Sequence, residues 1–437
     1  MNTNDKSNNN VLIEPFKEAF KTAGATRWKL FETVEDSFDC APDLVCLSHL
    51  RWDFVYQRPQ HLMSRCAMER RVFFIEEPTF HNDTVAQLDI RLREGGVCVV
   101  VPRLPKGLSE HEINVTQKLL IDELIAECRI RDYVLWYYTP MALSFASHLN
   151  PQAIVYDCMD ELSCFKGAPA AMREREAELL ALADVVFTGG QSLYEAKRRQ
   201  HKNIHPFPSG IDVSHFGQAR DISEDLEDQA AIPHPRLGFF GVIDERMDIA
   251  LLDRLAEARP DWHLIMIGPV VKIDPSDLPR RPNIHYLGGR NYKELPKYLA
   301  GWDVALLPFA LNESTRYISP TKTPEYLAAG KPVVSTKIRD VVRPYGEMNL
   351  VRIAEGHSEF IKAVEDCLKE KDRDGHSEWL VRVDELLSQN SWDKTWLRMM
   401  KEIDRAVSAR QSAPRTTLSD RVRRSAHKVG LGPTSTD

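Results

Sequence analysis

The sequence lacks any apolar run long enough to cross a membrane. A spanning helix needs about 20 consecutive apolar residues, and the longest uncharged stretch, residues 133–147, is broken by Thr139, Pro140 and two serines. Residues 1–10 are polar and do not resemble a secretory signal, so they predict a frayed tail. From these features we expect no spanning helix and a cytoplasmic location.

Cysteine is sparse, and none of the eight cysteines forms a CxxC pair. Cys46, Cys66 and Cys98 lie in apolar or helical contexts, which predicts small core residues in a reducing compartment. Walker, GxGxxG, HExxH, GxSxG and zinc-site patterns are also missing. The 57 basic residues are outnumbered by 64 acidic ones, which gives a net charge of −7 and no reason to expect a nucleic-acid partner.

The 437 residues instead show a regular alternation of short apolar runs and helical patterns. Near-continuous apolar runs are typical of parallel strands that are buried on both faces. The predicted strands are 43–48, 71–75, 97–101, 133–137, 153–157 and 184–188, then 237–241, 263–267, 284–287, 303–308, 332–336 and 350–353. Helical patterns lie between them. The sequence therefore predicts an α/β protein with two doubly wound, Rossmann-like domains in series.

A polar, acidic segment that ends in two prolines separates the two series of strands. The predicted organisation is a tail and lead-in (1–40), an N-terminal domain (41–217), a linker (218–235), a C-terminal domain (236–390), a closing helix (391–407) and a basic tail (408–437). Ligands of doubly wound sheets bind beyond the carboxyl ends of the strands. We therefore expect a cleft between the domains.

The segment 311–336 predicts a strand, a loop, a helix and a further strand. Ser319 is a good N-cap, and Pro320 suits the first helical position. A helix N-terminus attracts phosphate, and Lys322 adds a full charge. Glu325 stands where its carboxylate can accept hydrogen bonds from two ribose hydroxyls. An ordinary capped crossover with an i,i+3 Lys–Glu pair explains the same residues equally well.

The pattern S-P-T-K-x-x-E-Y-L-A-A-G-K-P-V-V-S at 319–335 resembles the donor site of GT-B glycosyltransferases, above all the bacterial group 1 family. Residues 207–216, 237–246 and 391–404 are similar to the approach to the linker, the donor domain's glycine loop and the closing helix of that family. The resemblance covers about residues 43–405. It implies a nucleotide-sugar donor on the C-terminal domain and an acceptor on the N-terminal one.

The resemblance also implies roles for individual residues. Ser319, Thr321 and Lys322 would hold the donor diphosphate, and Glu325 its ribose. Gly241 would let the backbone approach the diphosphate or the sugar.

The sequence departs from the family pattern at the first glutamate of retaining members, where it has Tyr317. Glu313 would replace that glutamate only if the loop bulges. Val242 stands where an arginine usually follows the loop glycine, and Arg246 is the nearest cation that could act at the phosphates. Whether the enzyme retains or inverts the sugar therefore stays open.

Residues 48–61 combine aromatic and hydrogen-bonding side chains in the turn after the first strand. Such a turn suits a sugar, because ring faces stack on C–H surfaces and polar groups bind hydroxyls. Cleft-facing loops often carry function, which makes acceptor-binding candidates of Arg51, Trp52, Asp53 and Gln57. The alternative is a loop folded over its own core.

Residues 156–166 place Asp157, Asp160 and Glu161 just past a strand. An inverting enzyme needs a general base for the acceptor hydroxyl, and Asp157 at the strand end is our candidate. The same residue could instead cap the following turn. We expect Asp160 and Tyr138 near the acceptor, although a core position is equally open for Tyr138, and we expect Glu161 to face solvent.

Two charged segments carry weaker predictions. Residues 372–374 spell a DxD pattern, the metal–diphosphate signature of another transferase fold, but their charged surroundings predict solvated surface. The basic segment 405–428 could contact an anionic membrane face, where each basic residue adds about 1 kcal/mol, or could be a disordered tail.

Together these features predict a metal-independent glycosyltransferase without a cofactor, in which Lys322 and Asp157 are catalytic. Its partners would be a UDP- or GDP-linked sugar, a glycan or lipid-linked acceptor and, through the tail, the inner membrane face. Two alternatives stay open: a nucleotide-sugar epimerase on the same scaffold, and a non-catalytic nucleotide-sugar binder.

Overall fold

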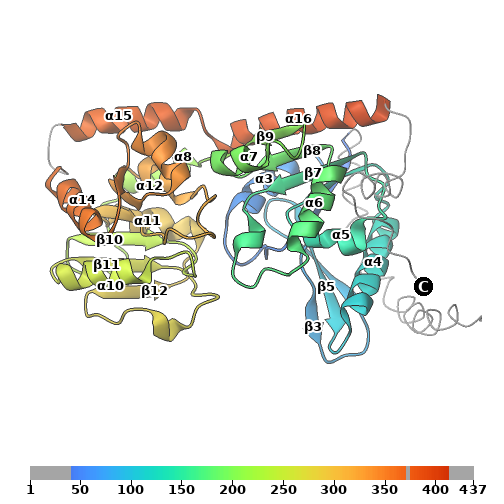
Figure 1. The fold of residues 1–437 in the computed structure, drawn as a ribbon, viewed down its shortest axis with the longest axis horizontal. Helices are drawn as coiled ribbons and strands as arrows, with labels where there is room; N and C mark the ends of the chain where they lie inside the picture. Colours follow the sequence, from blue (N-terminus) through green and yellow to red (C-terminus); the bar gives the residue numbers. More distant parts are fainter. Residues whose placement is uncertain (1–40, 371–374, 413–437) are drawn as a thin grey trace, which may run out of the picture. The chain divides into compact units, whose positions relative to one another are not determined.

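The computed structural model describes residues 41–370 and 375–412. Their contacts divide them into two compact units. The first unit contains residues 41–157, 171–186 and 401–412, and the second contains 158–170, 187–370 and 375–400. Each unit is built on a β-sheet with helices packed around it (Figure 1). The domain boundaries that we expect from the sequence stay a prediction.

The first sheet has nine strands, in the order β3-β5-β2-β1-β6-β7-β8-β9, with β4 paired to β5. The strands are β1 (Asp43–Leu47), β2 (Val72–Ile75), β3 (Thr79–His81), β4 (Gln87–Leu92), β5 (Val97–Pro105), β6 (Tyr133–Tyr137), β7 (Ala153–Cys158), β8 (Val185–Thr188) and β9 (Ile204–Pro206). β1 pairs in parallel with both β2 and β6, and every residue of these three strands is buried. The predicted parallel, two-sided burial is therefore confirmed.

The second sheet has six strands in the order β12-β11-β10-β13-β14-β15, and all its pairings are parallel. The strands are β10 (Arg236–Phe240), β11 (His263–Ile267), β12 (Ile284–Gly288), β13 (Val304–Leu307), β14 (Val333–Thr336) and β15 (Arg352–Ala354). The order reverses at β10, which is where a doubly wound sheet binds its ligand.

The helices of four or more residues lie between these strands or, for the last three, after β15. They are α3 (Arg58–Cys66), α4 (Glu110–Glu127), α5 (Leu143–Ala146), α6 (Met172–Leu182), α7 (Gln191–Lys197), α8 (Val213–Gly217), α9 (Glu227–Ala230), α10 (Ile249–Ala258), α11 (Leu295–Ala300), α12 (Lys322–Ala328), η7 (Val342–Gly346), α14 (His357–Glu370), α15 (Gly375–Ser388) and α16 (Trp392–Ser412). Shorter turns are η2 (Pro140–Ala142), η3 (Leu162–Cys164), η4 (Gln218–Arg220), η5 (Pro275–Asp277), η6 (Tyr292–Glu294) and α13 (Arg339–Val341).

The sequence pattern did not predict β3 and β4, two strands of the first sheet. β3 and β4 have partly exposed residues and lack the continuous apolar run of a buried strand. β4 pairs antiparallel with β5 and extends the sheet at its edge. The closing helix is longer than expected, because α16 continues to Ser412. The cysteines in the described residues are free, and Cys46, Cys66 and Cys98 are buried, so their predicted core role is confirmed.

A buried ion pair joins α3 to the end of β7. The Arg58 guanidinium donates two hydrogen bonds to Asp157, from Nε to Oδ2 at 2.9 Å and from Nη2 to Oδ1 at 2.8 Å. Arg58 is 1% exposed and Asp157 is 0% exposed. Burial raises the pKa of Asp157, and the Arg58 charge opposes that rise. Such a pair holds its two elements in one geometry, because either charge alone would be costly in this environment.

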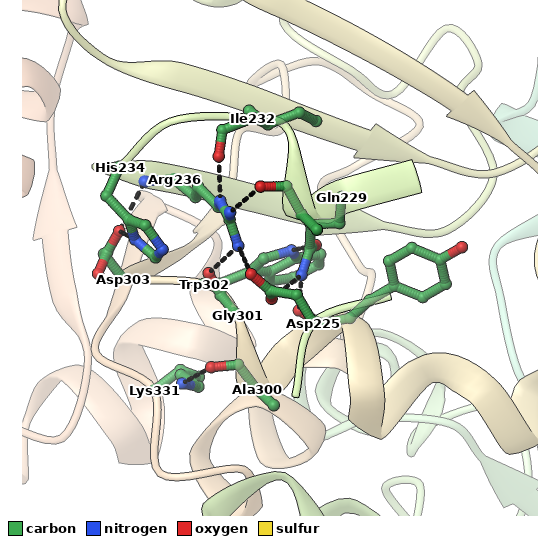
Figure 2. A network of polar contacts seen from close by, with 12 residues as sticks. Asp225, Gln229, Ile232, His234, Arg236, Ala300, Gly301, Trp302, Asp303 and Lys331 are labelled. Carbon is green, nitrogen blue, oxygen red and sulfur yellow. Dashed lines mark hydrogen bonds and ion pairs between the residues drawn. The ribbon is translucent and has the colours of Figure 1, made fainter. Parts of the chain in front are cut away.

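The predicted linker is docked on the second unit through a polar network (Figure 2). Arg236, the first residue of β10, donates from Nη1 to Asp225 at 2.6 Å and from Nε to the Ile232 carbonyl at 2.7 Å. Gln229 is completely buried, and its Oε1 accepts a 3.0 Å hydrogen bond from the Trp302 indole. The acidic composition suggests a connector, but one of its acidic residues, Asp225, pairs with the buried Arg236.

The Gln229–Trp302 bond gives a stability prediction. Gln229→Leu leaves the buried Trp302 N–H without its acceptor, which should lower the free energy of unfolding by about 1–3 kcal/mol. Urea denaturation of the full chain measures this change. Glu227→Leu, at an exposed position on the same helix, is the control and should change stability little. Equal effects of the two variants would contradict a structural role for the network.

The Arg58–Asp157 pair gives a second stability prediction. Asp157→Leu removes the carboxylate that compensates the buried Arg58 guanidinium and should destabilise the protein by about 3–5 kcal/mol. The double variant Arg58→Met/Asp157→Leu removes both charges and should recover most of that loss. Thermal and urea unfolding would show it, and a double variant less stable than the single one would refute the pairing argument.

Candidate functional site

Lys322 lies at the start of α12, which follows a loop after β13. Our prediction of Ser319 as the N-cap is wrong, because the capping position is Thr321 and no side chain caps it. The Thr323 N–H donates to the Pro320 carbonyl at 3.2 Å. Pro324 has no N–H with which to make the α-helical bond to that carbonyl, so the first turn is tightened and the regular helix starts later.

The Lys322 ammonium is half-buried against the end of β10. Its Nζ donates to Thr321 Oγ1 at 3.0 Å and lies 6.0 Å from the centre of the Phe240 ring. Gly241 has a φ of +144°, and a Cβ there would lie 2.9 Å from Lys322 Cε. Glycine is therefore required for this close approach. Loss of hydration lowers the pKa of Lys322, while Glu325 opposes that change.

Gly268, directly after β11, closes the neighbouring turn. Its φ is +145°, and a Cβ would lie 1.7 Å from the Gly241 carbonyl oxygen. The two glycines thus let the ends of β10 and β11 approach each other where the sheet meets Lys322.

Glu325 lies one turn further along α12. Its Oε2 is buried and has no hydrogen-bond partner in the part of the chain that the structure describes. Burial raises the pKa of Glu325 to about 7, and the Lys322 charge acts against that rise. Buried polar atoms are normally hydrogen-bonded, so this oxygen has the character of a ligand-binding group.

Arg246 and Asp160 are electrostatic neighbours of Lys322. The Arg246 charge lowers the pKa of Lys322, and the Asp160 charge raises it. Arg246 Nη2 donates to Asp244 Oδ2 at 2.7 Å, and the guanidinium lies 5.4 Å from the centre of the Phe165 ring. The structure therefore brings the predicted donor residue Arg246 and the predicted acceptor residue Asp160 to the same cation.

Sequence reasoning missed the partners that orient Arg246, namely Asp244 and Phe165. The D-E-R sequence at 244–246 is a local signal for the first, since an aspartate two residues before an arginine can form such a pair. Phe165 lies some 80 residues earlier in the sequence and has no comparable signal.

Glu313 and Ser319 are two other predicted donor residues. Glu313 is exposed on the loop before α12. Ser319 packs against the backbone of Gly190, where an added Cβ would lie 2.7 Å from Ser319 Cβ. Their donor roles stay predictions.

In the first unit, much of the 48–61 loop folds over its own core. Trp52 is 8% exposed and packs edge-on against Phe74, with the ring centres 5.1 Å apart. Arg51 donates from Nη1 to Glu76 Oε2 at 2.9 Å and to the Glu77 carbonyl at 2.5 Å. Of our two readings of this loop, the geometry supports the core reading for Trp52.

The remaining acceptor candidates of this unit differ in exposure. Asp53 is exposed and accepts a 2.6 Å hydrogen bond from Arg93 Nη2. The Gln57 N–H donates to Gln60 Oε1 at 3.0 Å at the start of α3. Tyr138 is 1% exposed beside Asp157, which fits the core position that we left open.

Two carboxylates of the 156–166 segment, those of Asp157 and Glu161, form ion pairs with basic residues. Asp157 is wholly buried and paired with Arg58, so in this conformation it exposes no oxygen to an acceptor hydroxyl. Its role as a base stays a prediction. Our expectation that Glu161 faces solvent is wrong, because it is 14% exposed and lies 2.7 Å from the Lys197 ammonium. That long-range pairing removes it from water.

A cavity of about 300 Å³ lies in the first unit, at the carboxyl ends of β1, β2 and β6. Its lining combines apolar groups with carboxylates, amides and hydroxyls, from Leu47, Ser48, Ile75, Glu76, Glu77, Pro78, Phe80, Glu110, Ile113, Asn114, Gln117, Thr139, Met141, Ala142, Ser144 and Phe145. Clefts of this composition at this end of a parallel sheet are typical ligand sites.

Within residues 41–370 and 375–412, no group of three or more His, Cys, Asp or Glu side chains is placed to hold a metal ion. Among the helices of the same residues, none combines the length and apolar character needed to cross a bilayer. The DxD run at 372–374 and the tail from residue 413 lie outside the described residues.

Comparison with known proteins agrees with the donor-site pattern. Residues 234–370 match the family model "Glycosyl transferases group 1". A Bacillus subtilis (strain 168) protein named as a candidate teichuronic acid biosynthesis glycosyltransferase, TuaH, is 27% identical over 241 residues. That match covers 50% of this chain and 59% of TuaH, so it spans less than two thirds of the relative.

Solved structures are similar over most of the chain. A sucrose-phosphate synthase from Thermosynechococcus elongatus has a TM-score of 0.64 at 15% identity and covers 84% of this chain and 100% of its own. An E. coli structure titled "Trehalose-6-phosphate", bound with UDP-2-fluoro glucose, has a TM-score of 0.61 at 13% identity, with coverages of 85% and 100%. Anabaena Alr3699/HepE in complex with UDP has a TM-score of 0.56 at 14% identity, with coverages of 83% and 100%.

At such identities the likeness shows the fold, and it confirms the predicted pair of parallel α/β domains. The family match includes the whole 319–335 pattern. Residues 234–370 are therefore similar to the group 1 glycosyltransferase family, and the chain has the two-domain α/β fold of these solved glycosyltransferases.

Proposed function

We propose that this protein is a glycosyltransferase that moves a sugar from a nucleoside-diphosphate donor to a hydroxyl of a glycan or lipid-linked acceptor. One observation carries the proposal. Lys322, with Arg246 as its electrostatic neighbour, lies against the Gly241 turn and next to a partnerless Glu325 oxygen. All four residues fall within the stretch that matches the family.

The leaving nucleoside diphosphate gains negative charge as the glycosidic bond breaks, and the enzyme must stabilise that charge. The Lys322 ammonium is partly desolvated before the donor arrives, so a diphosphate would restore interactions that water does not supply. Interactions between charges are stronger where water is excluded. Glu325 would accept hydrogen bonds from the donor ribose through its partnerless oxygen.

We propose that the cations Lys322 and Arg246 supply the positive charge at the diphosphate, which makes a metal ion unnecessary. Asp244 compensates part of the Arg246 charge and also fixes the direction of its guanidinium. Among the residues that the structure describes, no carboxylate lies at hydrogen-bond distance from Lys322, so we assign Lys322 the larger part in catalysis.

On the acceptor side, Asp160 is better placed than Asp157 to act near the reacting centre. Asp157 is completely buried in its pair with Arg58. Asp160 is half-buried and acts electrostatically on Lys322 and Arg246. We propose that Asp160 contacts the incoming acceptor, while Asp157 positions the scaffold.

The sequence likeness to TuaH supports a role in polysaccharide biosynthesis, and solved neighbours of the same fold hold UDP or a UDP-sugar analogue. We therefore propose UDP- or GDP-linked sugars as donors. We also propose a cytoplasmic location, with contact to the inner membrane face through the basic tail.

The role of Lys322 gives the central prediction. Lys322→Ala should slow release of nucleoside diphosphate from the donor by about 100-fold, equivalent to about 3 kcal/mol of barrier, because a preorganised charge is lost. The donor would first be chosen by thermal-shift screening of UDP, GDP, ADP and their common sugars. Release would then be measured with acceptor mixtures.

Lys337→Ala is the matched control, because Lys337 is an exposed lysine of the same unit whose partner is Glu355. Its rate should equal that of the wild type, and both variants should unfold like the wild type. Wild-type turnover by Lys322→Ala would overturn the site. Conversion of the donor without any acceptor would indicate an epimerase instead, and binding without turnover would indicate a non-catalytic binder.

The Glu325 carboxyl gives a pH prediction. Its pKa of about 7 leaves it mostly protonated at pH 6 and mostly ionised at pH 8. The ionised form accepts ribose hydrogen bonds more strongly, so donor affinity should rise by up to about tenfold between these pH values. Calorimetry with an intact nucleotide sugar measures this rise, because its phosphodiesters do not titrate in this range. Glu325→Gln should flatten the profile, and an unchanged profile would contradict the assignment.

A further inference from the structure

We infer that the cavity of the first unit receives a neutral or basic glycosyl group and excludes a phosphorylated one. The inference rests on the proposed function, and it narrows the acceptor to a chemical class. The residues that line the cavity belong to the first unit, whereas Lys322 belongs to the second. The volume of the cavity and the charge of its lining support the inference.

The cavity has the position and size of a sugar site. The ends of β1 and β2 contribute Ser48 and Glu76, and the end of β6 is followed by Thr139. Its volume of about 300 Å³ is at the lower end of the range for small-molecule sites. That volume suits one sugar residue, with the rest of a longer acceptor outside.

The lining offers both kinds of contact that a sugar ring needs. Phe80, Met141 and Phe145 provide apolar surfaces for C–H faces. Asn114 and Gln117 provide amides that can bind hydroxyls. Phe80 is 46% exposed, so it lies at the rim, where it can contact a group as it enters.

The charge of the lining is negative. Glu76, Glu77 and Glu110 line the cavity, and its lining within residues 41–370 and 375–412 includes no lysine, arginine or histidine. Arg51 compensates Glu76 from outside the lining, through a 2.9 Å bond. Glu77 has no direct side-chain bond to Arg51, which instead binds its backbone carbonyl. Among the described lining residues, Glu77 and Glu110 therefore have no direct ionic partner, although the Arg51 charge acts on Glu77 from outside the lining.

Charge repulsion of this kind selects between acceptors. Near a protein surface, at an effective dielectric constant of about 20, one like charge about 6 Å away weakens binding by about 100-fold. A phosphate would meet Glu77 and Glu110 and would find no cation in the lining to offset them. A neutral sugar meets no charge repulsion, and the carboxylates can accept hydrogen bonds from its hydroxyls. An amino sugar would in addition form an ion pair between its ammonium group and a carboxylate.

The test compares matched sugars on the full chain by saturation-transfer NMR titration. The probes are methyl α-glucoside and methyl α-mannoside against glucose 6-phosphate and mannose 6-phosphate, without nucleotide. We expect each neutral glycoside to bind at least tenfold more tightly than its phosphorylated counterpart. Phe145→Ala should weaken the neutral probes, which assigns the binding to this cavity.

Charge reversal is the decisive variant. Glu77→Lys/Glu110→Lys should raise the affinity for the 6-phosphates by at least about tenfold relative to the neutral probes. Glu127→Lys is the control on the opposite end of α4 and should leave the ratio unchanged. Both substitutions lie at exposed positions, where folding tolerates charge.

Three results would overturn the inference: phosphosugars that bind the wild type as tightly as neutral ones, a ratio insensitive to the charge reversal, or no binding by any probe. Failure of the proposed function has a different signature. It appears as loss of nucleotide binding or of Lys322 dependence, and it leaves the selectivity of the cavity unaffected.

Discussion

The functional interpretation depends on a lysine ammonium that is held partly out of water. Lys322 loses hydration against β10 and Phe240, and a glycine at 241 is what allows it to lie there. An ammonium in that position is destabilised until an anion arrives. Burial acts on its neighbour Glu325 in the same way, because it favours the neutral carboxyl and raises the pKa of Glu325 to about 7. The two groups together prepare a polar surface that a nucleoside diphosphate with a ribose would complete.

The rest of the second unit keeps that surface in place. β10 starts at Arg236, which is held by the linker through Asp225 and Ile232, and it ends directly before Gly241 (Figure 2). The network thus anchors one end of the strand whose other end faces Lys322. A buried arginine is costly unless it is fully paired, so the linker's acidic residues have a structural use. On α12, which contacts the other end of the strand through Lys322, Glu325 by contrast has an oxygen with no hydrogen-bond partner among the described residues.

In the first unit, too, one carboxylate is paired inside the protein while others line a cavity. Asp157 is enclosed with Arg58 and ties α3 to β7, whereas Glu77 and Glu110 line a cavity without such a partner. The first arrangement stabilises the fold, because its charge is matched inside the protein. The second leaves negative charge to act on whatever enters the cavity. Position, more than residue type, decides which acidic groups are available to a ligand.

The parallel sheets and the segment around Lys322 could be predicted from the order of the residues alone. Continuous apolar runs require burial on both faces, and the 319–335 pattern is local, so both can be read from neighbouring residues. Three contacts, by contrast, depend on how the chain folds: Trp52 is packed in the core, Glu161 pairs with Lys197, and Arg246 lies against the ring of Phe165. The cavity likewise depends on the fold, because its lining residues come from β1, β2, β6 and α4 and the segments next to them. These features join residues that are far apart in the chain, and spacing along a sequence carries no information about which distant side chains the fold brings together.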